Sequence, residues 1–429
     1  MVESILIKDI DIIFADEIRK GDIFLKNGKI QALDWYLNIP SELMIKGSGL
    51  TAMAGLIDSH VHFREPGFTE KEDFITGSKA AAKGGVTSIF EMPNTNPATT
   101  TIKLLEQKKI IAAQKSLVNY NFFLGATVDN LTDLLSTKNI PGIKLFLGSA
   151  QKPLLLNNLE ALEILFSKTN KLIAVHAELP LGLNNTNTHS LEEAINGTKL
   201  VIELAQKYQK RIHLLHISSK EELEIIEKAK TKNTENGFFL TVEVTPQHLL
   251  CNTSDPKNKK DPLLKINPPI REKNQQIEIY KSLKKGVIDT IATDHAPHLT
   301  TEKLVDYNFA PSGMPGLETL FPLLLNEVNQ KKLTLFEITK LLNINPAKIF
   351  KIKNKGLIKE NYDADLVILD LKTRKKVSNE NLVTKCSWSY FNGLSLQGWP
   401  IMTIVNGNLV YREGDFLDAP KGKEITILD

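Results

Sequence analysis

The chain has 429 residues, more than one average domain, although α/β barrels of about 250 residues fold as a single unit. Hydrophobic residues make up 42% and charged residues 24%, as in ordinary globular proteins, and the net charge of +3 argues against a strongly basic surface for nucleic acid. No apolar run approaches the ~20 residues that cross a bilayer, and the N-terminus lacks the basic and apolar regions of a signal peptide.

Both ends of the chain have the pattern of β-strands. Near the start, Asn27-Gly28 separates two short apolar runs, and Asn406-Gly407 does the same near the end, which is typical of a tight hairpin. Residues 363–371 read as a further strand. Since strands from opposite ends of a chain can pair in space, we predict one small β-sandwich domain built from residues 1–52 and 352–429.

The middle of the chain, residues 53–351, alternates short apolar runs with amphipathic helical segments such as 190–208 and 219–230. Eight such repeats predict an α/β fold, a (β/α)8 TIM-like barrel whose chemistry lies at the carboxyl ends of its strands. The predicted strands are residues 56–62, 86–92, 121–126, 143–148, 172–177, 212–217, 239–244 and 287–293.

Histidines stand at the ends of three of these predicted strands. His60 and His62 are one residue apart, so on a strand they face the same side and could bind a transition metal together. His176 and His216 each end a separate strand; a single histidine there is often a core residue, but four at one end favour a metal site. We expect His213 to be structural, and His189, in a polar loop, to lie on the surface.

Asp294 follows the last predicted strand. A carboxylate at that position can bind a metal and accept a proton from metal-bound water, which is the role of a general base in hydrolysis. The alternative is that Asp294 caps the following turn.

Lys144 lies inside the apolar run GIKLFLG, where a charged ammonium is costly. A buried lysine tends to lose its proton, and a neutral amine can react with carbon dioxide to form a carbamate that bridges two cations. The alternative is a lysine that extends from the strand end to solvent.

Nine short motifs occur in an order that resembles the cyclic amidohydrolases, and among them the dihydroorotases. They cover the chain from about residue 50 to 350, and NPAKIF (345–350) with DADLVILD (363–370) resembles the family's return from barrel to sandwich. The match is specific as a set, although no single motif is. The motifs are DSHVHFREPG (58–67), EMPNTNPAT (91–99), GIKLFLG (142–148), VHAE (175–178), HLLHIS (213–218), VEVTPQHL (242–249), INPPIR (266–271), ATDHAPH (292–298) and SGMPGLET (312–319).

The resemblance implies a centre of two zinc ions, which lower the pKa of bound water towards ~7. By ligand type alone, cobalt or manganese would also fit. Some dihydroorotases use an aspartate as the bridge, whereas the lysine found here is shared with hydantoinases. The implied ligands are His60, His62 and Asp294 for one ion, His176 and His216 for the other, and a carboxylated Lys144 that bridges both.

Arg64 is the residue that favours dihydroorotase over the other cyclic amidohydrolases. Dihydroorotate carries a carboxylate that hydantoins, dihydrouracil and allantoin lack, and a guanidinium can bind it with a planar fork. The alternative is a surface ion pair of Arg64 with Glu65 or Glu70. The resemblance assigns the remaining substrate contacts to Asn94, Asn267, His298, Ser312 and Gly313.

The implied reaction is the reversible cyclisation of N-carbamoyl-L-aspartate to dihydroorotate in pyrimidine synthesis, with Asp294 carrying the proton to the ring nitrogen. The alternatives are a hydantoinase, dihydropyrimidinase or allantoinase, and an inactive scaffold homologue, which the complete set of ligand residues disfavours. We expect a small-molecule substrate, no nucleic-acid or membrane partner, and a monomer or a homo-oligomer.

Two further expectations concern the environment of the protein and one loop. The only cysteines, Cys251 and Cys386, lie far apart and suit a reducing compartment, so we expect a cytoplasmic protein. Residues 299–311 are expected to form a mobile loop near the substrate.

Overall fold

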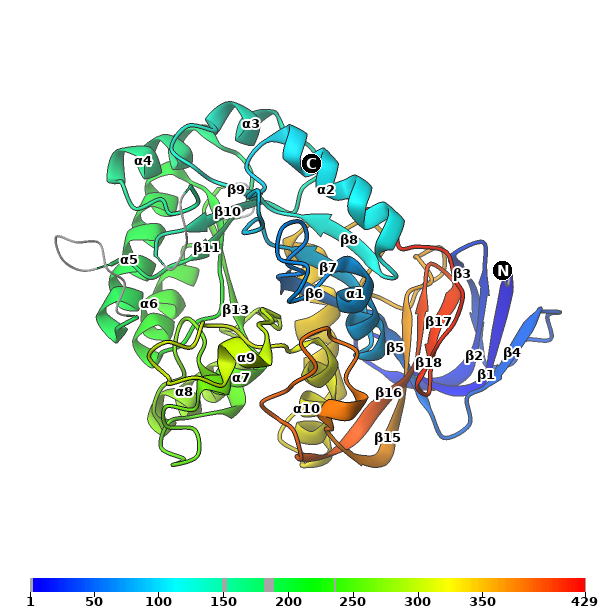
Figure 1. The fold of residues 1–429 in the computed structure, drawn as a ribbon. Coiled ribbons are helices and arrows are strands. Elements are labelled where there is room, and N and C mark those ends of the chain that lie inside the picture. Colours follow the sequence, from blue (N-terminus) through cyan, green and yellow to red (C-terminus); the bar gives the residue numbers. More distant parts are fainter. Residues whose placement is uncertain (1–2, 149–152, 181–188, 235–236, 429) are drawn as a thin grey trace.

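The computed structural model describes residues 3–148, 153–180, 189–234 and 237–428. Strands from both ends of the chain join in one nine-stranded, largely antiparallel sheet in the order β18-β17-β16-β15-β5-β1-β2-β3, with β4 beside β1 (Figure 1). Its strands are β1 (Ser4–Ile13), β2 (Ile18–Lys26), β3 (Lys29–Asp34), β4 (Leu43–Lys46), β5 (Thr51–Ala54), β15 (Leu366–Lys376), β16 (Ser395–Val405), β17 (Asn408–Arg412) and β18 (Asp415–Phe416).

Both predicted hairpin turns are confirmed. Asn27 and Gly28 have φ of 52° and 74°, and Asn406 and Gly407 have 49° and 77°, so both central residues of each turn are left-handed, as a tight hairpin of this type requires. The two turns also touch each other, because a Cβ on Gly28 would lie 3.2 Å from the carbonyl oxygen of Asn406. The pairing of the two chain ends is therefore held at the turns as well as along the strands.

The middle of the chain forms two parallel sheets, β6-β7-β8 and β14-β13-β12-β11-β10-β9. Only Phe123 separates β8 from β9, and a parallel bridge between Val61 and His295 joins the other edges. Each predicted strand segment overlaps a strand, and residues 121–126 contain the end of β8 and all of β9. The strands are β6 (Leu56–Val61), β7 (Val86–Glu91), β8 (Asn119–Phe122), β9 (Leu124–Gly125), β10 (Ile143–Phe146), β11 (Ile173–His176), β12 (Arg211–Leu214), β13 (Phe239–Val244) and β14 (Thr290–Ile291).

Helices follow most of the parallel strands, and α3 to α6 lie on the outer side of β9 to β11 (Figure 1). Both predicted helical segments form: α5 begins with a capping box between Ser190 and Glu193, and Ser219 caps α6. The longer helices are α1 (Phe74–Lys83), α2 (Ile102–Lys115), α4 (Leu159–Lys168), α5 (Leu191–Tyr208), α6 (Lys220–Lys230), α8 (Lys273–Lys285) and α10 (Leu317–Asn329). The short ones are α3 (Leu131–Ser136), α7 (Pro246–Leu250), η1 (Pro262–Leu264), α9 (Thr300–Lys303), α11 (Leu335–Thr339), η2 (Lys340–Ile344), α12 (Asn345–Ile349) and η3 (Asn379–Asn381).

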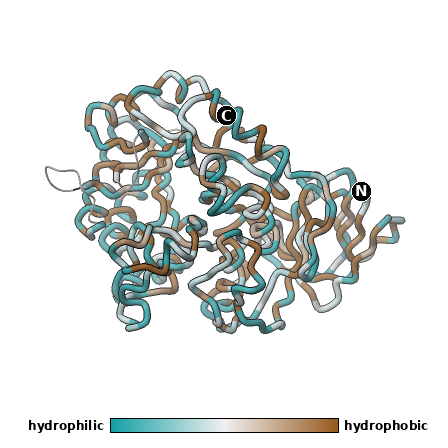
Figure 2. Tube along the Cα trace, in the orientation of Figure 1, coloured by the Kyte–Doolittle hydropathy of each residue, from teal (hydrophilic) through white to brown (hydrophobic). Residues whose placement is uncertain are grey.

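The last part of the chain returns to the parallel sheets. Glu424 forms a parallel bridge with Tyr120 in β8 and an ion pair of 3.0 Å with Lys109 in α2, which places the C-terminus beside α2 (Figure 1). Apolar segments run along the strands, and hydrophilic segments are frequent on the loops around them (Figure 2). Within the described ranges, no helix has the length and apolar character needed to cross a membrane.

A separate apolar cluster lies among the parallel strands and is completed by Phe350. The ring of Phe350 is 2% exposed, and its centroid lies 5.1 Å from that of Phe90 and 6.0 Å from that of Phe123. His213 also contacts it, with ring centroids 5.3 Å apart, which agrees with the structural role expected for His213.

We predict that Phe350→Ala lowers the free energy of unfolding by about 3–5 kcal/mol, because it leaves a cavity among these rings. Urea denaturation would measure the change. Phe309→Ala is the matched control, since Phe309 is 83% exposed and its loss should cost no more than about 0.5 kcal/mol. Equal effects of the two substitutions would contradict the packing role of Phe350.

Candidate active site

All twelve predicted site residues line one cavity of about 830 Å³. They come from the carboxyl ends of the parallel strands and from the loops that follow them, where a barrel places its chemistry. These residues are His60, His62, Arg64, Asn94, Lys144, His176, His216, Asn267, Asp294, His298, Ser312 and Gly313.

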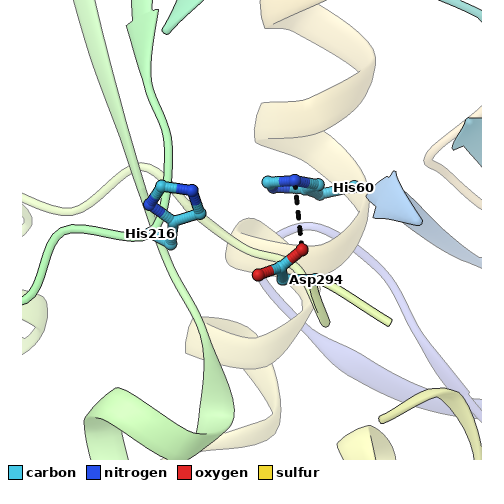
Figure 3. A group of neighbouring side chains, drawn as sticks. All are labelled: His60, His216 and Asp294. Carbon is cyan, nitrogen blue, oxygen red and sulfur yellow. Dashed lines mark ion pairs between the residues drawn. The ribbon is translucent and has the colours of Figure 1, made fainter. Parts of the chain in front are cut away.

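Asp294 and three histidines converge at the bottom of this cavity. Nε2 of His62 lies 2.9 Å, and Nε2 of His60 3.3 Å, from Oδ1 of Asp294. Figure 3 shows His60, His216 and Asp294 directed at a common space, and their ligand atoms lie within 4.8 Å of one another. Asp294 itself has a left-handed φ of 48°, and among the described residues its carboxylate contacts His60 and His62 and accepts from no backbone N–H, so the capping alternative is wrong.

Electrostatics keep this centre in the form that binds cations. Burial alone would raise the pKa of Asp294, but its contacts with His60 and His62 outweigh burial, and the pKa falls to about 2. Burial lowers the pKa of His62 to about 4. A carboxylate and a neutral imidazole therefore coexist at neutral pH.

Glu243 orients His60 and was not identified from the sequence. It is fully buried in β13, and its Oε1 accepts a hydrogen bond of 2.8 Å from Nδ1 of His60. When Nδ1 carries the single ring proton, Nε2 presents a lone pair towards Asp294, and carboxylate partners of this kind commonly orient metal-binding histidines. A charged residue inside the apolar run FLTVEV was the available signal, the same one that singled out Lys144.

His176 and His216 form the other side of the centre, with 2.9 Å between Nδ1 of His176 and Nε2 of His216. Burial lowers the pKa of both rings. Glu178, which was also not identified from the sequence, accepts hydrogen bonds from Nε2 of His176 at 2.9 Å and from Nδ1 of His189 at 2.8 Å. His189, predicted to lie on the surface, is only partly exposed: its side chain is 24% accessible and bonds to this buried carboxylate.

Lys144 is fully buried in β10, which pairs with β11, the strand that ends at His176. Its Nζ has no hydrogen-bond partner among the described residues and lies 4.5 Å from the ring centroid of Phe146. Burial lowers the pKa of this amine to about 7, although the charges of Asp294 and Glu243 oppose the shift. The alternative in which Lys144 extends to solvent is therefore wrong.

Polar groups suited to an anion line the same cavity at Arg64 and His298. Arg64 Nε donates to the carbonyl oxygen of Pro297 (3.1 Å), and its NH2 lies 3.2 Å from Nε2 of His298. Asn94 accepts from Nδ1 of His62 through Oδ1 (2.6 Å), which leaves its amide nitrogen to donate to a ligand. Arg64 thus faces the cavity.

The far wall of the cavity is the 312–313 backbone. Ser312 Oγ donates to Oδ1 of Asn267 at 3.0 Å. Gly313 has φ of 131°, and a Cβ there would lie 2.5 Å from the carbonyl oxygen of Ala296, so only glycine allows this approach.

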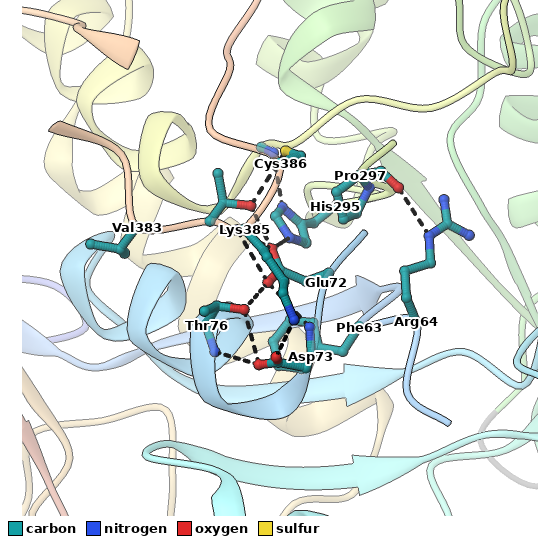
Figure 4. A network of polar contacts seen from close by, with 12 residues as sticks. Phe63, Arg64, Glu72, Asp73, Thr76, His295, Pro297, Val383, Lys385 and Cys386 are labelled. Atoms are coloured by element: carbon teal, nitrogen blue, oxygen red, sulfur yellow. Dashed lines mark hydrogen bonds and ion pairs between the residues drawn. The ribbon is translucent and has the colours of Figure 1, made fainter. Parts of the chain in front are cut away.

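A buried polar network supports the loop that carries Asp294 (Figure 4). Glu72 is fully buried; Nε2 of His295 donates to it at 3.3 Å, and Thr384 and Lys385 from the C-terminal region also donate to it. The carbonyl oxygen of His295 accepts from the backbone nitrogen of His62 at 2.8 Å. Through His295, the network thus connects the C-terminal region to His62 and to Asp294, which precedes His295 in the chain.

Residues 299–311 contain α9, and Lys303 anchors them. The Nζ of Lys303 donates to the carbonyl oxygens of Lys265 (3.1 Å), Pro311 (2.9 Å) and Gly313 (2.9 Å). Trp388 Nε1 also donates to the carbonyl oxygen of His298 just before this segment, at 2.7 Å. The segment connects His298 to Ser312, both of which line the cavity, and Lys303 fixes its buried side.

The fold and the convergent histidines, lysine and aspartate are those of a metal-dependent hydrolase, and comparison with known proteins agrees: residues 51–410 match the amidohydrolase family, to which the chain belongs. Within it the chain is a member of the dihydroorotase family. It is 39% identical to the dihydroorotase of Methanosphaera stadtmanae, over 84% of this chain and 85% of that one. It is 33% identical to the dihydroorotase of Pyrococcus horikoshii, over 96% of this chain and 93% of that one.

Solved structures share the fold over nearly the whole chain. L-hydantoinase (dihydropyrimidinase) from Arthrobacter aurescens has a TM-score of 0.92 at 27% identity and covers 99% of this chain and 100% of its own. Dihydropyrimidinase from Brevibacillus agri has a TM-score of 0.89 at 24% identity, which shows the fold alone. The family and the hydrolase class expected from the sequence are confirmed.

Proposed function

We propose that the protein is a zinc-dependent dihydroorotase that interconverts N-carbamoyl-L-aspartate and dihydroorotate in pyrimidine biosynthesis, in the cytoplasm. One observation carries the proposal: Arg64 faces into the same cavity as the convergent histidines, Lys144 and Asp294. Family membership supplies the reaction class, and the guanidinium supplies the reason for a substrate that bears a carboxylate.

The residues present fit a pair of metal ions. When Nδ1 of His60 donates to Glu243, the ring's Nε2 lone pair faces a carboxylate oxygen of Asp294, and two acceptors at this distance call for a cation between them. Nδ1 of His216 and Nζ of Lys144 are buried and have no hydrogen-bond partner among the described residues. His60, His62 and Asp294 would hold one ion, His176 and His216 the other, and a carboxylated Lys144 both.

When bound, zinc ions lower the pKa of water and polarise an amide carbonyl, which is the chemistry that opening a cyclic amide needs. The chain's own residues do the rest. Asp294, a carboxylate at neutral pH, can take a proton from the attacking water and deliver it to the leaving ring nitrogen. Arg64, Asn94 and His298 hold the substrate's carboxylate and thereby orient the ring.

Carboxylation of Lys144 would convert its neutral amine and carbon dioxide into a carbamate and a proton. The loss of charge on burial supports this step, since only the neutral amine has a lone pair to form the new bond to carbon.

We predict that Lys144→Met leaves the protein folded but lowers the bound zinc from two ions per chain to one or fewer. Elemental analysis after dialysis would measure this, with thermal melting as the control for folding. The wild-type chain should also gain about 44 Da in a native mass spectrum, the mass of carbon dioxide. Two tightly bound ions in the variant would contradict the bridging role.

The scaffold for this site is proposed to be a closed (β/α)8 barrel of residues 53–351. Support comes from the continuous chain through β8 and β9 and from the bridge between Val61 and His295. The nine-stranded sheet would form the two layers of a β-sandwich from residues 1–52 and 352–429, enclosing its own apolar core, which includes Ile7, Ile23 and Ile368.

A substrate panel on zinc-loaded protein tests the proposed function. Cyclisation of N-carbamoyl-L-aspartate and hydrolysis of dihydroorotate should be fast, whereas hydantoin, dihydrouracil and allantoin should react slowly or not at all. Activity on an uncharged ring, with none on dihydroorotate, would overturn the proposal. It would favour the second candidate, a hydantoinase or dihydropyrimidinase, which the structural likeness to L-hydantoinase supports.

A further inference from the structure

A second cation lies beside Arg64 in the wall of the cavity. Phe68 N donates to the carbonyl oxygen of Arg64 (2.9 Å) and Lys71 N to that of Phe68 (3.0 Å), so both cationic side chains come from the same tight loop. The Nζ of Lys71 lies 2.7 Å from Oε1 of Glu302 in α9 and 3.3 Å from Nδ1 of His298. Its side chain is 16% exposed and lines the cavity.

These contacts assign the ring proton of His298. A lysine ammonium only donates, so Nδ1 of His298 must accept from Lys71 and the proton must lie on Nε2. The carbonyl oxygen of Ser312, 3.1 Å from Nε2, can only accept and favours the same tautomer. Burial and the charges of Arg64, Lys71 and Lys303 lower the pKa of His298 to about 2, so the neutral ring carries a single proton.

With the proton on Nε2, two donors face each other. The NH2 of Arg64 lies 3.2 Å from Nε2 of His298, and neither atom can accept from the other. An anionic oxygen beside them would accept from both, and hydrogen bonds from charged donors to a carboxylate are stronger than those to an uncharged carbonyl. The charges of Arg64, Lys71 and Lys303 all lower the pKa of the His298 ring. The carboxylate that faces the ring is that of Glu302, whose Oε2 lies 3.6 Å from Nδ1.

We infer that Lys71 is a positioning residue that selects for a substrate bearing a carboxylate, because it holds His298 as a hydrogen-bond donor beside Arg64. The inference deepens the proposed function and rests on it for the identity of the substrate. Lys71 acts through His298, so its loss affects substrate binding more than the chemical step.

Kinetics of two Lys71 variants test this inference. Lys71→Met should raise the KM for dihydroorotate roughly ten-fold or more, with a smaller change in kcat, and Lys71→Arg should recover most of the loss because it keeps a charged donor. Lys207→Met is the matched control: Lys207 pairs with Glu163 at 2.8 Å on the exposed surface and should leave both constants unchanged. An unchanged KM in Lys71→Met would overturn the inference.

Two further measurements separate positioning through His298 from a general structural effect. In a His298→Ala background, Lys71→Met should add little to the rise in KM, whereas full additivity would contradict the coupling. Long-range nitrogen–proton NMR of histidine-labelled protein should show His298 protonated on Nε2 in the wild type and a mixture of tautomers in Lys71→Met. Because this spectrum needs no substrate, it tests the inference even if the wild type fails to turn over dihydroorotate.

Discussion

Arg64→Met is expected to lower kcat/KM for dihydroorotate by about 10²–10³-fold, because two hydrogen bonds between a guanidinium and a carboxylate each contribute about 1.5–3 kcal/mol, part of which water recovers. Most of the loss should appear in KM. Arg64→Lys keeps the charge but loses the planar fork, so its kcat/KM should lie between those of the wild type and Arg64→Met. Steady-state kinetics with zinc-loaded protein would measure all three.

The controls for Arg64 separate recognition from damage to the metal centre. The zinc content of Arg64→Met should equal that of the wild type, since Arg64 bonds to Pro297 and contacts His298, neither of which is an expected ligand. Arg19→Met removes an arginine whose side chain is 61% exposed and should change nothing. Wild-type KM in Arg64→Met would show that the carboxylate binds elsewhere or that the substrate has none.

Asp294→Ala is expected to lower kcat by about 10⁴-fold, or about 5.5 kcal/mol of activation free energy, while substrate binding and most of the zinc remain. The reason is that Asp294 is the carboxylate within hydrogen-bond reach of both His60 and His62, and its low pKa keeps it ready to accept a proton. Single-turnover rates and calorimetric binding of dihydroorotate would separate the chemical step from binding.

Asp294→Asn extends this test, because it keeps the shape of the side chain and removes its charge. It should be as inactive as Asp294→Ala if proton transfer is the main role. Thermal melting excludes a loss of folding, and Asp306→Ala in the neighbouring segment should keep wild-type rates. A wild-type rate in either Asp294 variant would remove Asp294 from the reaction.

Periodicity predicted the elements well where they are long. Residues 239–244 coincide with β13, and residues 190–208 with α5 and its N-cap. Periodicity predicted the short elements poorly. Of the predicted strand 287–293, only Thr290 and Ile291 form β14, and the chain turns at Asp294 with a left-handed backbone. The pattern of apolar residues does not encode such a turn. Residues 121–126 divide at Phe123, where β8 ends its pairing with β7 and β9 begins pairing with β10.

The sequence by itself determined the residue types of the centre and their places at strand ends, because alternation along a strand fixes which side chains share a face. It could not show partners that lie hundreds of residues away. Glu243 reaches His60, 183 residues away, and Thr384 reaches Glu72, 312 residues away, only because the folded chain brings those segments together. Tertiary structure alone also decided that Lys144 is buried with no hydrogen-bond partner in the described part of the chain and that Lys71 contacts His298, since burial and tautomer depend on neighbours in space.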